Sequence, residues 1–139
     1  MAPEYIFPCA VIDAVTAYLH VLKEYDPASV HLIGDSAGGG LVLATLLAIR
    51  DGGWPQPTGA IALSPWLDLT HSLPSFQTNV DTDFLPRNPY GNGESDAQVH
   101  LYATDTELKN PYVSPMWAKD LSRLCPLLIV PSFCVRVIS

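Results

Sequence analysis

The chain has 139 residues, of which 48% are hydrophobic, so it can bury the core of one domain, or of part of one, and is not expected to be disordered throughout. Its formal net charge is −7, from 14 acidic and 7 basic residues. Because no basic cluster occurs in the sequence, the composition predicts neither nucleic acid nor an anionic membrane surface as a partner.

Cysteine usage and the first residues indicate the compartment. Cys9, Cys125 and Cys134 are an odd number at no metal-ligand spacing, so we expect no disulfide framework, no metal site and reduced, buried thiols. The stretch Met1 to Glu4 lacks the basic region of a signal peptide, which predicts a cytoplasmic location. The longest apolar run, 37–49, is too short to cross a membrane.

Hydrophobic periodicity predicts alternating helices and strands. In chain order, we expect a helix at 8–24, a strand at 29–33, a helix at 37–50, a strand at 58–63 and a strand at 126–130. Two strands joined by a helix of this length form a parallel unit, so the predicted fold class is α/β, with a parallel sheet flanked by helices.

The stretch 70–110 differs from its surroundings. It is rich in Pro, Gly, Asn and Asp, with scattered apolar residues, so we expect a long excursion that holds one or two short helices. Long loops at the carboxyl edge of an α/β sheet shape binding sites, and the alternative is a plain surface loop. The tail 131–139 indicates no element.

A serine motif lies between the first predicted strand and the helix after it. The residues are Gly34-Asp35-Ser36-Ala37-Gly38. A G-x-S-x-G turn in this context holds its serine in a strained conformation at the top of a parallel sheet, where the hydroxyl is exposed as a nucleophile. The N–H of Ala37 then opens the helix and can donate to an oxyanion. Gly34 and Gly38 lack a Cβ, which lets strand and helix approach closely.

Other interpretations of this stretch stay open. It could be a helix-entry loop in which Ser36 or Asp35 caps the helix. A phosphate-binding loop fits less well, because no Lys follows the glycines and no G-x-G-x-x-G spacing occurs.

Four segments together match one family. They are Ala2-Pro3-Glu4 with Phe7-Pro8-Cys9-Ala10, the turn 34–39, Leu63-Ser64-Pro65-Trp66-Leu67-Asp68, and Tyr112-Val113-Ser114-Pro115. In this combination the chain resembles the hormone-sensitive-lipase-like branch of the α/β-hydrolase fold, a group of esterases and lipases. The resemblance covers residue 2 to about residue 130. It implies a partial α/β-hydrolase domain over 1–139 that lacks the family's N-terminal strands and its C-terminal strand and helix.

The resemblance also implies an activity and residue roles. The family hydrolyses carboxylic esters with a Ser-Asp-His triad, without metal or cofactor. Ser36 would be the nucleophile that forms an acyl-enzyme, and Ala37 N–H one oxyanion donor. The other residues of the turn would be structural: Gly34, Asp35, Gly38 and Gly39. Asp35 would lie beside the site without being the triad acid.

Three parts of the family site have no counterpart in the sequence. No His-Gly-Gly precedes Ser36, no Asp or Glu follows Asp120, and no His follows His100. Since the family's order is Ser, Asp, His, we expect no triad Asp or His in this chain. In the family, the nucleophile strand pairs with a strand from upstream sequence, so we also expect an unpaired, hydrophobic edge here.

Other titratable residues are weighed as substitutes. His71 and His100 in the excursion could reach the site as a base, although solvated loop histidines are the default. His20 is expected on the polar side of the first helix and His31 on the first strand. The remaining candidates are interpreted as loop carboxylates: Asp68, Asp81, Asp83 and Asp96.

The sequence therefore predicts a carboxylic ester hydrolase that acts on a small-molecule ester through Ser36 and is catalytically incomplete as this chain stands. The alternative is a non-catalytic truncated product or pseudoenzyme that binds a small apolar ligand, and a peptidase or thioesterase on the same fold is a third reading. Four aromatic residues either line the substrate pocket or belong to ordinary packing: Trp66, Phe76, Phe84 and Tyr90.

Overall fold

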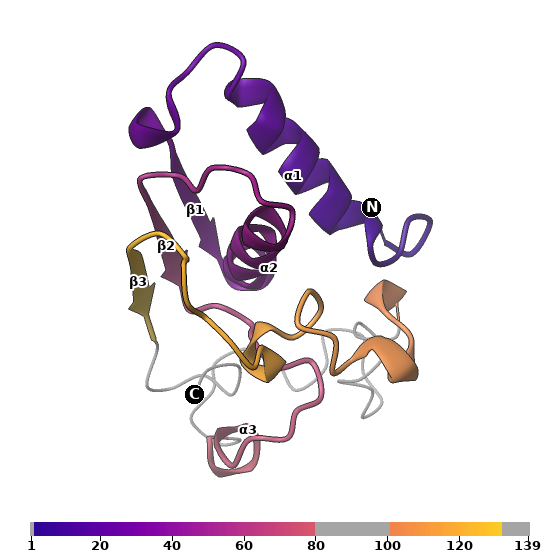
Figure 1. Ribbon diagram of the computed structural model, residues 1–139. Helices are drawn as coiled ribbons and strands as arrows, with labels where there is room; N and C mark the ends of the chain where they lie inside the picture. The colour runs from indigo at the N-terminus through magenta and orange to yellow at the C-terminus, as the bar shows by residue number, and fades with distance from the viewer. Residues whose placement is uncertain (1, 80–100, 132–139) are drawn as a thin grey trace.

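The computed structural model describes residues 2–79 and 101–131. The elements in chain order are α1 (Cys9–Val21), the 3-10 turn η1 (Pro27–Ser29), β1 (His31–Asp35), α2 (Ala37–Asp51), β2 (Gly59–Leu63), α3 (Ser75–Thr78), the 3-10 turns η2 (Asp105–Glu107) and η3 (Pro115–Trp117), and β3 (Leu127–Val130). Figure 1 shows α1 and α2 on the same side of a small sheet, with the long connections gathered near the carboxyl ends of the strands.

The sheet confirms the predicted α/β class. Its strands run in the order β1-β2-β3, and both neighbouring pairs are parallel. Ile33 of β1 pairs with Ile61 of β2, which pairs with Leu128 of β3. Because α2 connects β1 to β2, the β1-α2-β2 stretch is the parallel unit that the sequence predicts.

Element ends differ from the prediction by a few residues. The first strand begins at His31 rather than at residue 29, because 27–29 form η1, whose start is capped by the Asp26 carboxylate accepting from Ala28 N at 2.8 Å. The first helix ends at Val21 rather than at residue 24. The described part of the excursion contains α3 and η2, as the expectation of one or two short helices requires.

Helix α2 forms the centre of the core. Leu46, Leu47 and Ile49 on this helix are fully buried. One side of α2 packs on Ala60 and Ala62 of β2, and another on the apolar side chains of α1. Burial of each large aliphatic side chain contributes about 1.5–3 kcal/mol, so these contacts fix α2, and with it the turn that opens α2, against the sheet.

The opposite face of the sheet is apolar and exposed. Ile33 is 63% exposed and Leu128 56% exposed, and the strand register places both on this face. In the described part of the chain, β1 pairs with β2 on one side and with no strand on the other. The expected unpaired, hydrophobic edge of the nucleophile strand is therefore confirmed for these residues.

Two glycines allow the start of α2 to approach its neighbours. A Cβ on Gly34 would overlap the carbonyl group of Gly38, and a Cβ on Gly40 would overlap the carbonyl oxygen of Trp66. A Cβ on Gly38, by contrast, would meet no described atom within 4 Å. The expectation that Gly38 is needed for close packing is thus wrong, because the close contacts lie at Gly34 on the β1 side and at Gly40, two residues further along α2.

A buried carboxylate organises the loop that follows β2. Asp68 is only 6% exposed, and its Oδ2 accepts from Ser72 N at 2.8 Å and from Ser72 Oγ at 2.9 Å. Its Oδ1 accepts from Thr70 N at 2.9 Å and from the Thr70 hydroxyl. Burial raises the pKa of Asp68, but these hydrogen bonds outweigh burial and hold the pKa below its ordinary value. Asp68 is thus a loop carboxylate, as interpreted, but a buried one rather than a solvated one.

The first prediction compares two glycines on α2. Gly40→Ala should destabilise the fold by about 1–3 kcal/mol, because the methyl group would be forced against the Trp66 carbonyl. Gly38→Ala adds the same atoms at an open position of the same helix, so it should leave stability unchanged or raise it by up to about 1 kcal/mol. Urea unfolding followed by circular dichroism measures both values, and equal effects would contradict the packing argument.

The second prediction concerns Asp68 and pH. Because its pKa is lowered in the folded state, the ionised carboxylate stabilises the fold above its unfolded pKa, and this contribution is lost as pH falls through the folded pKa. Asp68→Asn should therefore cost about 1.5–3 kcal/mol at pH 7 and less near about pH 3.

Asp120→Asn is the matched control. The exposed Asp120 carboxylate also accepts from Ser122 N at 2.7 Å and from Ser122 Oγ at 3.0 Å, but in solvent, so its removal should change stability much less. Urea unfolding of both variants at the two pH values makes the comparison. A deficit for Asp68→Asn that does not change with pH would rule out the ionised carboxylate as its cause.

Candidate active site

Ser36 occupies the turn between β1 and α2 in a strained conformation. Its φ of 51° and ψ of −120° place a non-glycine residue at positive φ, and the residue is exposed. Its side chain makes no capping hydrogen bond to α2, which argues against the reading of Ser36 as a helix cap. Such backbone geometry costs about 1–3 kcal/mol and persists where surrounding contacts enforce it.

Backbone hydrogen bonds from two other segments hold this turn in place. Ser36 N donates to Leu63 O, at the end of β2, at 2.9 Å. Ser36 O accepts from Gly40 N at 3.1 Å and from Trp66 N at 2.9 Å. The main chain of the serine is therefore fixed by β2 and by the loop after it, while its hydroxyl is left exposed.

The residues around Ser36 take different positions. Ala37 is the first residue of α2, so its N–H has no acceptor within the helix and lies at the positive end of the helix dipole. Asp35 is exposed at the end of β1, in register with Leu63. A Cβ on Gly39 would come within 2.8 Å of Pro65 Cβ. The geometry is that of a nucleophile turn with one backbone donor beside the hydroxyl.

The three described histidines lie in different parts of the fold: one in the loop after β2, one on α1 and one on β1. His71 is half-buried between two aromatic rings, with its ring centroid 5.8 Å from that of Trp66 and 4.0 Å from that of Phe76, so it is not the solvated loop histidine that was the default. His20 on α1 and His31 on β1 are exposed. The other candidates lie outside the described residues: His100, Asp81, Asp83, Asp96, Phe84 and Tyr90.

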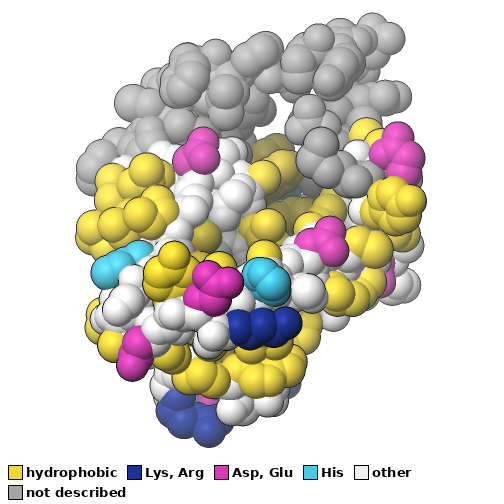
Figure 2. Space-filling view, turned by 90° about the horizontal axis from the view of Figure 1, so that it is seen from above, with side chains coloured by type: hydrophobic (Ala, Val, Ile, Leu, Met, Phe, Trp, Pro, Cys, Tyr) yellow, Lys and Arg dark blue, Asp and Glu magenta, His cyan; other side chains and the backbone are white. Residues whose placement is uncertain are grey.

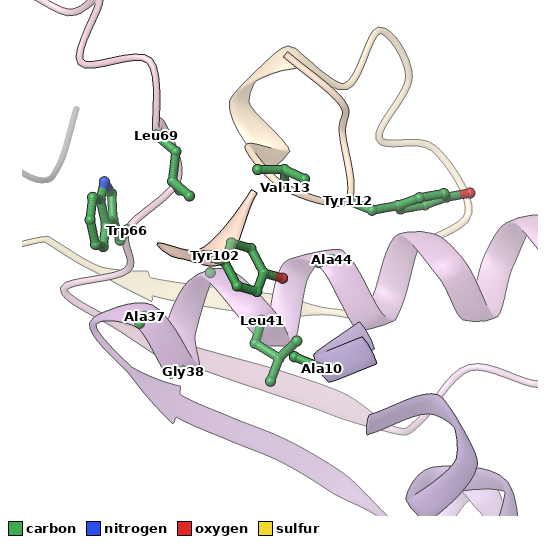
Figure 3. Close-up of a pocket in the computed structure, with 11 residues that line it drawn as sticks. Ala10, Ala37, Gly38, Leu41, Ala44, Trp66, Leu69, Tyr102, Tyr112 and Val113 are labelled. Atoms are coloured by element: carbon green, nitrogen blue, oxygen red, sulfur yellow. The ribbon is translucent and has the colours of Figure 1, made fainter. Parts of the chain in front are cut away.

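An apolar pocket with a cavity volume of about 340 Å³ lies beside the start of α2. Figure 3 shows Ala37, Gly38, Leu41 and Ala44 of α2 along one side, with Trp66 and Leu69 of the loop after β2 and Tyr102 and Val113 around the other. Of the two interpretations of the aromatic residues, pocket lining and ordinary packing, the first fits Trp66, which lines this pocket. The second fits Phe76, which stacks on His71.

Sequence reasoning missed several residues of this wall. In the sequence, Leu41 and Ala44 are interpreted only as part of a buried helix, and Tyr102 is not identified as a candidate at all. The spacing of Leu41 and Ala44 after the serine, three residues apart on one face of α2, is the signal that could have found them. Tyr102 carries no such signal, because its position depends on the path of the excursion.

The part of the chain that the structure describes offers no cluster of three His, Cys, Asp or Glu side chains that could hold a metal ion. Cys9 is half-buried and Cys125 is buried, both as free thiols, and burial raises the pKa of Cys125, while Cys134 lies outside the described residues. Within the described ranges, no helix is both long and apolar enough to span a bilayer. On the face seen in Figure 2, Lys and Arg side chains lie apart among apolar and acidic ones.

Known proteins share this arrangement of elements. A family profile described as the alpha/beta hydrolase fold matches residues 1–133. An acetyl-hydrolase of Streptomyces hygroscopicus is 40% identical over 91% of this chain and 41% of its own length. An arylesterase of Saccharolobus solfataricus is 34% identical over 94% of this chain and 43% of its own length.

Solved structures give the same result. The crystal structure of a hormone-sensitive lipase from a metagenome library has a TM-score of 0.87 and 39% identity, and the match covers 99% of this chain and 46% of that one. EstE5, in a crystal soaked with p-nitrophenyl butyrate, has a TM-score of 0.84 and 43% identity over 93% of this chain and 42% of that one. The chain thus spans less than half the length of these relatives, and it belongs to the hormone-sensitive-lipase-like group of the α/β-hydrolase family.

Proposed function

We propose that this chain carries the nucleophile of a carboxylic ester hydrolase, with Ser36 as that nucleophile. The observation that supports the proposal most is the strained Ser36 backbone at the β1–α2 turn, with φ 51° and ψ −120°, in a chain whose relatives are named esterases and acetyl-hydrolases. Strain of this kind is retained where it serves a site. The substrate class is a small-molecule ester, and no cofactor is needed.

The mechanism follows from the position of the hydroxyl. Ser36 Oγ attacks the ester carbonyl carbon while a general base takes its proton, and the Ala37 N–H donates to the developing oxyanion. The alcohol leaves with that proton to give an acyl-enzyme, which water hydrolyses. Within this scheme Gly34, Asp35 and Gly39 shape the turn, and neither they nor Gly38 enter the reaction. The family order places the triad aspartate and histidine after β3, where residues 131–139 contain no Asp, Glu or His. The proposal therefore leaves both groups outside this chain.

The second candidate function is binding without turnover. A chain that lacks the triad acid and base but keeps the apolar pocket beside α2 would bind a small apolar ligand as a pseudoenzyme. The cytoplasmic location and the exclusion of nucleic acid as a partner stay predictions beside both functions.

The third prediction separates these functions by covalent labelling. A fluorophosphonate probe should label the folded chain at Ser36, identified by peptide mass spectrometry, but only slowly, because the base that activates the hydroxyl is not in this chain. Ser36→Ala should lose the label completely. Ser64→Ala is the matched control, because Ser64 also has positive φ, at 43°, and directly follows β2; it should keep the label.

Two results would count against catalysis. One is the absence of labelling in a chain whose circular dichroism shows it to be folded, and the other is labelling that survives Ser36→Ala. A p-nitrophenyl acetate assay beside the corresponding anilide then tests the bond class. Ester turnover without amide turnover supports an esterase, whereas amide turnover supports a peptidase on the same fold.

A further inference from the structure

Among the described residues that line the pocket beside α2, one hydroxyl makes no hydrogen bond to another described residue. None of the residues described along this wall is charged. Trp66 Nε1 donates to Asp68 O at 3.0 Å, and the Tyr112 hydroxyl donates to Asp51 Oδ2 at 2.7 Å. Figure 3 accordingly shows the Tyr112 hydroxyl directed away from the pocket. The remaining polar side-chain group on the wall is the hydroxyl of Tyr102.

Two contacts with Phe7 hold Tyr102 in place, one through its main chain and one through its ring. Its carbonyl oxygen accepts from Phe7 N at 2.7 Å, and its ring packs edge-on against Phe7, with centroids 6.3 Å apart and planes at 67°. In Figure 3 the ring lies next to Leu41 of α2, with the hydroxyl on the side of Ala44. No hydrogen bond to this hydroxyl occurs among residues 2–79 and 101–131, and burial raises the pKa of Tyr102, so the group stays a neutral donor and acceptor.

The mouth of the pocket adjoins the reacting groups. Ala37 and Gly38, which directly follow Ser36, line the same cavity as Leu41 and Ala44 further along α2. A chain attached to a carbonyl group at the Ala37 N–H would therefore run along α2 towards Tyr102. The short side chains of Ala37 and Ala44 leave room on the α2 side of this path.

We propose that this pocket holds the acyl chain of the ester and that the Tyr102 hydroxyl hydrogen-bonds an oxygen on that chain. The site would then favour uncharged oxo- or hydroxyacyl esters over plain alkanoyl esters. This inference rests on the proposed function for the placement of the carbonyl group. A charged chain is excluded, because an ion on this uncharged wall would be buried without a partner. The volume of about 340 Å³ lies at the small end of ligand pockets, which fits a chain of medium length.

The fourth prediction tests the hydroxyl contact by binding. Ligand-observed NMR titrations compare methyl octanoate with methyl oxooctanoates that carry the ketone at successive carbons, in a Ser36→Ala background that prevents turnover. At least one ketone position should bind about three- to tenfold more tightly than methyl octanoate, the range of one net hydrogen bond. Tyr102→Phe should abolish this preference and leave the affinity for methyl octanoate within about twofold, since the ring is kept.

Filling variants show whether the ligand occupies this pocket. Ala44→Phe places a ring inside the cavity and should weaken all these probes at least about tenfold, whereas Ala17→Phe makes the same change at an exposed site on α1 and should have no effect. Ala44 is also a core residue, so Leu41→Phe, at a half-buried wall position, replaces it if Ala44→Phe fails to fold. Unchanged binding in a folded filling variant would contradict the proposal, as would no binding at all or a ketone preference that survives Tyr102→Phe.

The outcomes separate this inference from the proposed function. Binding that depends on Tyr102 in a chain that fluorophosphonate does not label would overturn the catalytic role of Ser36 and keep the pocket assignment. Labelling at Ser36 without a Tyr102-dependent preference would keep the nucleophile and overturn the pocket assignment.

Discussion

The conformation of Ser36 depends on three backbone hydrogen bonds: one from Gly40 in the first turn of α2, and two that join the β1–α2 turn to β2 and to the loop after it. The strained residue costs about 1–3 kcal/mol, and three such bonds contribute about 0.5–1.5 kcal/mol each, so together they are sufficient to offset the strain. Two of the partners, Leu63 O and Trp66 N, lie far from Ser36 in sequence. The turn is therefore a tertiary feature, which exists only when β2 is paired in register with β1.

Because α2 is buried on two sides, the pocket residues that it carries are fixed in position relative to the serine turn. The helix is fixed between the sheet and α1 by side chains that are almost fully buried, and Gly40 lets its first turns lie directly against the Trp66 carbonyl. Ala37 and Ala44 therefore keep their distance to one another and to the loop above them. A rigid helix is needed here, because the same element presents a backbone donor at its start and a pocket wall along its side.

Some of this arrangement is local and could be predicted from the sequence. The parallel unit and the location of the serine turn follow from the apolar spacing and small side chains of residues close in sequence. The open edge of β1, by contrast, was expected only from the family resemblance. The environments of Asp68 and Tyr102 could not be predicted. The burial of Asp68 and the direction of the Tyr102 side chain both depend on the path of the excursion. The role of Gly38 was assigned incorrectly, and the constraint on Gly40 was missed, for a similar reason. Motif spacing marks glycines, whereas the neighbour that requires one, Trp66, comes from another loop.

The same loop links the charge of Asp68 to the shape of the pocket. The Asp68 carboxylate accepts hydrogen bonds from Thr70 and Ser72. Its main-chain carbonyl oxygen accepts from Trp66 Nε1. The next residue, Leu69, donates its N–H to the buried Ser114 Oγ at 2.9 Å. Trp66 and Leu69 both line the pocket, and their hydrogen bonds go to the main-chain carbonyl of Asp68 and to Ser114. The carboxylate of Asp68 itself holds the next residues of the loop, Thr70 and Ser72, and it accepts all of these bonds only when it is ionised. One short segment, 66–72, therefore combines two wall residues of the pocket with a buried carboxylate that fixes the path of the loop just after them.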